Sequence, residues 1–231
     1  MEALEAAKNF VAQTFPACDA AFLGGSVVRG EATATSDLDI VIVTQETQKA
    51  YRQSLYASGW PVEAFVNTPE SYRAFFASDA QRRRPSLPRM CAEGIILRER
   101  DGCAERIQRE AQALLDQGPE PLNAAEVTQL RYQLTDSLDD FAGSVRPGES
   151  FFLAATVAEL ATELILGYHR QWIGKGKWVL RALHAFDVNL AQRLRDALEN
   201  FSQREEKDQL IVFAQDALQL VGGRLFDGYS L

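Results

Sequence analysis

The sequence predicts an α+β protein in two parts: an N-terminal domain built on a β-sheet, followed by an all-α domain. In the first half, short apolar and β-branched runs alternate with amphipathic helical stretches. After the Gly-Pro-Glu-Pro segment at 118–121, the clearest boundary in the chain, only helical periodicity is found. We therefore expect one domain over residues 1–118 and a second over residues 119–231.

The first domain begins with a helix over residues 2–15, ended by Pro16, because its apolar residues recur at helical spacing. Further helices are expected at 70–80, 87–92 and 103–117, and strands at 20–23, 38–43, 62–66 and 95–98. Residues 46–58 also predict a helix, because Ala50, Tyr51, Leu55 and Tyr56 would all face the sheet and Gly59 would act as its C-cap.

Between the first two strands lies the turn Gly24-Gly25-Ser26. Glycine adopts backbone angles closed to other residues and leaves room for a ligand against the main chain. Ser26 is expected to open a short helix over 27–29. The unpaired N–H groups at a helix start suit a phosphate group.

The strand at 38–43 carries two carboxylates at its start. Side chains two residues apart on a strand point the same way, so Asp37 and Asp39 should face one spot beside the glycine turn. Two like charges held close repel each other, and a bound divalent cation would relieve that repulsion. These residues therefore predict a site for a metal ion and a polyphosphate.

The order of these motifs resembles the polymerase-β-like nucleotidyltransferase superfamily. The resemblance rests on Gly24-Gly25-Ser26, Arg29-Gly30 and Ser36-Asp37-Leu38-Asp39, the last followed by an apolar strand. It implies a mixed sheet, Mg²⁺ as cofactor and transfer of a nucleotide from an NTP such as ATP to an acceptor.

The same resemblance assigns residue roles. The nucleotide would bind at Gly25, Ser26, Arg29 and Ser36. The family adds a third carboxylate on a later strand, which Glu63 matches although it is not an aspartate. The implied catalytic and metal-binding residues are Asp37, Asp39 and Glu63.

The second domain predicts an antiparallel helical bundle. Its helices are expected at 123–142, 151–172, 178–186, 190–201 and 205–221. A catalytic α/β domain followed by a bundle resembles the aminoglycoside nucleotidyltransferases, in some of which a glycine–lysine turn after a long helix meets the nucleotide. Gly176-Lys177 is similar, so Lys177 is a candidate nucleotide ligand. The alternative interpretation is an exposed loop.

Composition limits the partners. The formal net charge of −8 and the pI near 4.9 argue against nucleic acid, which is bound through many Lys and Arg side chains. Three cysteines without metal-type spacing and an N-terminus lacking a signal-peptide pattern predict a cytoplasmic protein. The apolar stretch at 151–167 is interrupted by polar residues and is shorter than the roughly 20 residues of a membrane span.

These observations predict a metal-dependent enzyme that transfers AMP from ATP to a hydroxyl of a small acceptor. The acidic charge favours a cationic acceptor such as an aminoglycoside-like amino sugar. Two alternatives remain: a protein adenylyltransferase of the toxin–antitoxin type, and a non-catalytic nucleotide-binding regulator. The oligomeric state is not predicted by any pattern in the sequence.

Overall fold

The computed structural model describes residues 1–230 and consists of two compact units, Met1–Gly118 and Pro119–Leu231. The first unit contains a five-stranded sheet in the order β3-β4-β2-β1-β5. The strands are β1 (Ala20–Gly24), β2 (Leu38–Val43), β3 (Tyr51–Ala57), β4 (Trp60–Asn67) and β5 (Ile95–Glu99). Strands β2 and β4 pair in parallel and the other neighbours are antiparallel, so the predicted mixed sheet is confirmed.

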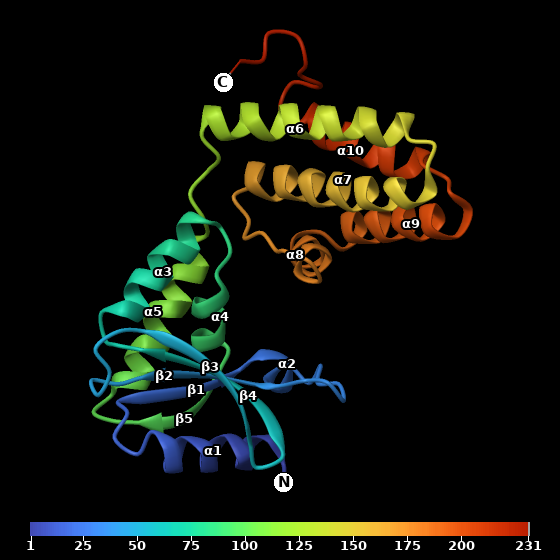
Figure 1. Cartoon of the computed structure of the whole chain (residues 1–231). Coiled ribbons are helices and arrows are strands. Elements are labelled where there is room, and N and C mark those ends of the chain that lie inside the picture. The colour runs from blue at the N-terminus through green and yellow to red at the C-terminus, as the bar shows by residue number, and fades with distance from the viewer. Residues whose placement is uncertain (231) are drawn as a thin grey trace. The chain divides into compact units, whose positions relative to one another are not determined.

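Helices cover both faces of this sheet (Figure 1). They are α1 (Ala3–Thr14), α2 (Gly25–Val28), α3 (Ser71–Gln81), α4 (Ser86–Ala92) and α5 (Cys103–Gln117). Alternation along β2 sorts its side chains: Leu38, Ile40 and Ile42 pack with α1, whereas Val41 and Val43 pack with α3, α4 and α5. Asp39 follows the same alternation, so it points to the side of α3, α4 and α5.

The helix predicted for residues 46–58 is wrong. Residues 51–57 form the edge strand β3, which pairs antiparallel with β4. Ser58 and Gly59 both have positive φ, 52° and 82°, which is the geometry of a two-residue hairpin turn and not of a helix C-cap. Leu55 and Ala57 pack on the α1 side of the sheet, so alternation at period two, not helical spacing, places them there.

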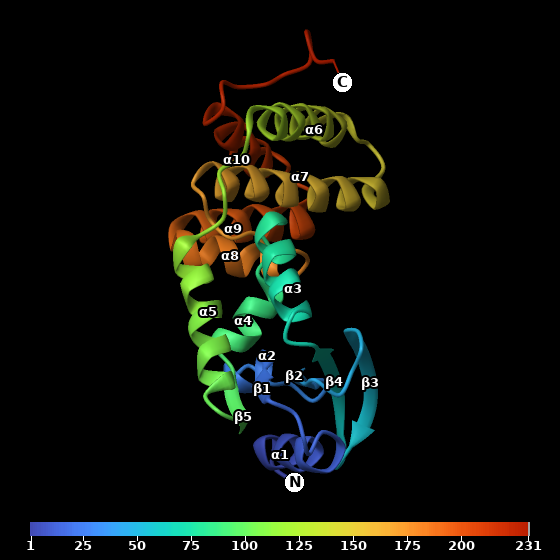
Figure 2. The same cartoon turned by 90° about the vertical axis from the view of Figure 1, so that its left-hand side faces the viewer.

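The second unit is all-helical, as predicted (Figure 2). Its helices are α6 (Ala124–Gly143), α7 (Pro147–Tyr168), α8 (Trp178–Phe186), α9 (Val188–Arg204) and α10 (Asp208–Gln219). A capping box between Asn123 and Glu126 starts α6. By length and composition α7 could cross a membrane, but 56% of its apolar window is buried among the other helices, as in the core helix of a soluble bundle.

The long helix of the bundle is displaced from its predicted bounds of 151–172. It begins four residues earlier because a proline stands in its first turn, where the missing N–H costs nothing. It ends at Tyr168 because Arg170 adopts a left-handed conformation with φ 54°.

Candidate active site

The candidate site is built on one row of residues that crosses four strands. Gly24 of β1 is the register partner of Asp39 on β2, and Asp39 is the partner of Glu63 on β4. Ser54 of β3 completes the row opposite Glu63. Register partners share a face of the sheet. The pairing therefore brings together two carboxylates that are 24 positions apart in the chain.

Three acidic side chains gather at this row. Asp37, Asp39 and Glu63 each offer a carboxylate oxygen, and these oxygens lie within 4.8 Å of one another. Burial, followed by the charges of Asp37 and Glu63, raises the pKa of Asp39 to about 6. The cluster therefore holds its negative charges together against mutual repulsion.

The turn after β1 lies directly against this cluster. Gly25 has φ +77°, and a Cβ at this position would stand 2.0 Å from Oδ2 of Asp39. Only glycine allows the backbone to pass so close to the carboxylate. The short helix starts at Gly25 itself, one residue before the predicted opening at Ser26, and ends at Val28.

The remaining predicted nucleotide ligands of the first unit surround this turn. The hydroxyl of Ser26 donates to that of Ser36 at 3.1 Å, which ties the turn to the loop that precedes β2. The Ser36 hydroxyl also accepts from the backbone N–H of Thr33 at 2.8 Å. Arg29 directly follows α2 and pairs with Glu31 at 3.2 Å. Its positive charge partly offsets the rise in the pKa of Asp39.

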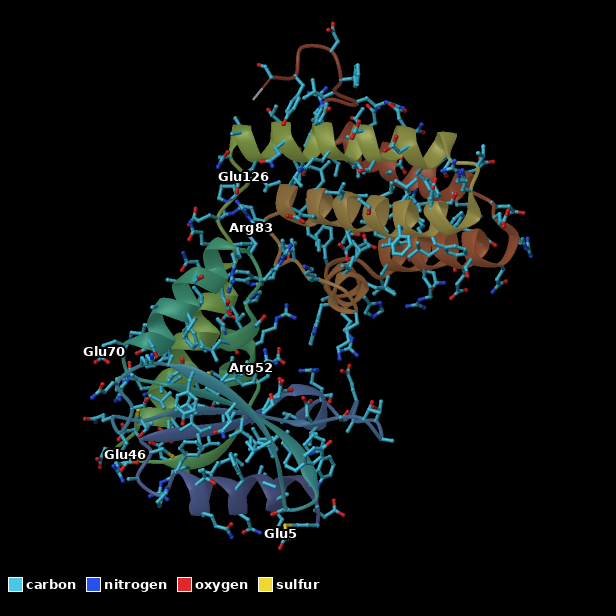
Figure 3. All side chains as sticks on the ribbon, viewed as in Figure 1. Glu5, Glu46, Arg52, Glu70, Arg83 and Glu126 are labelled. Carbon is cyan, nitrogen blue, oxygen red and sulfur yellow. The ribbon has the colours of Figure 1, made fainter. Side chains whose placement is uncertain are left out.

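Arg52 is the site residue that the sequence analysis missed. It lies on β3, two residues before Ser54 and so on the same face of the sheet, and its side chain is labelled in Figure 3. Its Nη2 contacts both carboxylate oxygens of Glu63, and its guanidinium lies 5.0 Å from the centre of the Phe65 ring. The hydrogen bond to Glu63 raises the pKa of Arg52 further, so the group is permanently charged. The sequence does not predict this contact, because the apolar residues of 46–58 recur at helical spacing.

The donor set suits a hard divalent cation. Three carboxylates converge, and oxygen ligands of this kind are those that Mg²⁺ and Mn²⁺ prefer. Burial, and then the neighbouring charges of Asp37 and Glu63, raise the pKa of Asp39, and a bound cation would offset the repulsion between these carboxylates. The residues present therefore fit the metal ion that the sequence predicts.

Lys177 lies in the other compact unit. It directly precedes α8 and its side chain is exposed, within a turn in which the backbone N–H of Trp178 bonds to the carbonyl of Lys175 at 3.1 Å. Its contact with a nucleotide stays a prediction.

Comparison with known proteins finds a family match within the first unit. Residues 4–82 match the family model described as a nucleotidyltransferase domain, a span that includes the turn, the three carboxylates and Arg52. A solved structure described as a nucleotidyltransferase-like protein from Exiguobacterium sibiricum 255-15 is similar with a TM-score of 0.45 and 11% identity, over 94% of this chain and 75% of that one. That likeness is too weak to carry an argument. The curated proteins include no match to this chain.

Proposed function

Because residues 4–82 make this chain a member of the polymerase-β-like nucleotidyltransferase superfamily, we propose that it transfers AMP from ATP to a hydroxyl of a small acceptor and releases pyrophosphate. The observation that carries the proposal is the cluster of Asp37, Asp39 and Glu63 in close contact with the turn at Gly25. Nucleotidyl transfer needs charge stabilisation at the α-phosphate, and this cluster is where the chain can hold the cation that supplies it.

Each residue has a role in this proposal. Asp37 and Asp39 would hold Mg²⁺, which neutralises phosphate charge when bound. The Gly25–Ser26 turn would leave space for the phosphates, and Arg29 and Ser36 would contact them. Glu63 has two possible roles: it could receive the proton of the acceptor hydroxyl or help to hold a second metal ion.

For the acceptor, we propose a small cationic molecule of the aminoglycoside-like class. The support is the net charge of −8, which attracts cations and disfavours nucleic acid. We also propose a reducing, cytoplasmic setting, which is supported by the free thiols of Cys18, Cys91 and Cys103. Lys177 would add a positive charge at the triphosphate.

The test is incubation of the protein with each NTP, Mg²⁺ or Mn²⁺ and a panel of acceptors. Pyrophosphate release and the mass of the adduct are the readouts. We expect pyrophosphate and a product that is heavier by one AMP, and we expect both to be lost in Asp39→Asn. An adduct on a protein would instead favour the protein adenylyltransferase. Nucleotide binding without any product would favour the regulator.

A further inference from the structure

The contact between Arg52 and Glu63 bears on the two roles left open for Glu63. Nη2 of Arg52 contacts both Oε1 and Oε2, so it lies on the side of the carboxylate where a chelated ion would sit. The Ser54 hydroxyl also lies 3.4 Å from Oε1. A second divalent ion held by both oxygens of Glu63 would have to displace the guanidinium.

The charge of the cluster leads to the same conclusion. Three ionised carboxylates and the Arg52 guanidinium together carry a net charge of −2, which one divalent ion neutralises. Arg29, the other cation that acts on Asp39, is itself paired with Glu31 at 3.2 Å. A second divalent ion would therefore bring excess positive charge into the cluster.

The register of the β3–β4 hairpin places Arg52 within reach of Glu63. Arg52 and Phe65 are register partners, as are Ser54 and Glu63, so all four side chains share one face of the β3–β4 hairpin. The guanidinium lies 5.0 Å from the centre of the Phe65 ring, and this cation–π contact favours its position over the ring. The hairpin thus places a positive charge beside Glu63.

We propose that Arg52 is a positioning residue that takes the place of a second divalent cation, so that the carboxylate cluster binds one ion. Glu63 is then left to receive the proton of the acceptor hydroxyl. This inference rests on the proposed function, because it assumes that Asp37 and Asp39 hold the first ion.

Mn²⁺ binding to the nucleotide-free full chain tests the inference, with electron paramagnetic resonance used to count the free ion. The wild type should bind one Mn²⁺ at the cluster, and Arg52→Met, which removes the charge but keeps an unbranched side chain, should bind a second with a Kd within about tenfold of the first. Arg52→Lys restores the charge and should return the stoichiometry to one. Asp39→Asn, alone and combined with Arg52→Met, identifies ions bound elsewhere on the acidic surface.

Arg73→Met is the matched control for Arg52→Met. Arg73 is also an exposed arginine of the first unit paired with a glutamate, Glu110, at 2.9 Å, so its removal changes the net charge equally. The Arg73→Met variant should bind one Mn²⁺, the number expected for the wild type. One ion in Arg52→Met, or two in the wild type, overturns the inference and leaves the proposed function standing. A wild type that binds no Mn²⁺ removes the proposed metal site and the inference with it.

Discussion

Replacing Asp39 with asparagine should stabilise the metal-free protein while removing its ability to bind Mg²⁺ and nucleotide. Burial, and then the charges of Asp37 and Glu63, raise the pKa of Asp39 from 3.8 to about 6. One pKa unit corresponds to about 1.4 kcal/mol of differential interaction. The ionised carboxylate should therefore cost on the order of 2–3 kcal/mol of folding free energy, which the neutral, similarly sized asparagine would not.

The pH dependence follows from the direction of this shift. Between about pH 3.8 and about pH 6, Asp39 is protonated in the folded chain and ionised in the unfolded chain, so wild-type stability falls as the pH rises. Above about pH 6 the loss is complete. The difference between Asp39→Asn and wild type should therefore be small near the lower pKa and reach on the order of 2–3 kcal/mol at neutral pH and above.

Urea unfolding in the presence of EDTA measures this difference. The two compact units can unfold separately, so the signal should come from the sheet unit. Trp60 on β4 provides it, in a background where Trp172 and Trp178 are replaced by phenylalanine. Addition of ATP and Mg²⁺ should then stabilise the wild type and leave Asp39→Asn unchanged. Equal unfolding free energies at pH 7.5 would refute the idea that repulsion and burial strain this carboxylate.

Three further predictions follow from other contacts. Gly25→Ala should weaken Mg²⁺ and ATP binding in calorimetry, because its Cβ would stand 2.0 Å from the Asp39 carboxylate; unchanged affinity would contradict this close approach. Asp79→Asn should have the opposite effect to Asp39→Asn and lower the unfolding free energy of the sheet unit in urea by about 1–3 kcal/mol. The buried Asp79 carboxylate accepts a hydrogen bond from the backbone N–H of Leu87 in α4 at 2.8 Å and forms an ion pair with Arg82. Lys177→Ala should weaken ATP binding by about 1.5–3 kcal/mol and Lys175→Ala should weaken it less; equal affinities in the wild type and Lys177→Ala would leave this turn as an exposed loop.

The parts of the site that the sequence predicts are those fixed by local rules. Asp37 directly precedes β2, so the strand alternation extended by one residue puts it on the same face as Asp39, and the glycine turn is close by in the chain. The position of Glu63 follows from the family resemblance, and its closeness to Asp39 depends on the parallel pairing of β2 with β4. No pattern within either strand specifies that register.

The parts that the sequence does not predict depend on strand β3. Most of its side chains are exposed, so it lacks the apolar alternation that marks a half-buried strand. Tyr51, Leu55 and Tyr56 happen to match helical spacing. The usable signal was Ser58-Gly59 between two runs of strand length, since glycine in the second position suits a hairpin turn. Reading that pair as a hairpin would have placed Arg52 opposite Phe65 and therefore near Glu63.

The difference between the central strands and the edge strand explains how like charges stay close together at this site. Strand β2 is paired on both sides, by β1 and by β4, so Asp39 and Glu63 cannot move apart without breaking the register of the sheet. Strand β3 is paired on one side only, and the Arg52 side chain is 59% exposed, so its guanidinium can shift while the carboxylates stay in place. A rigid centre thus fixes the ligand oxygens, and the compensating cation comes from the edge strand, where a change of position costs the least packing.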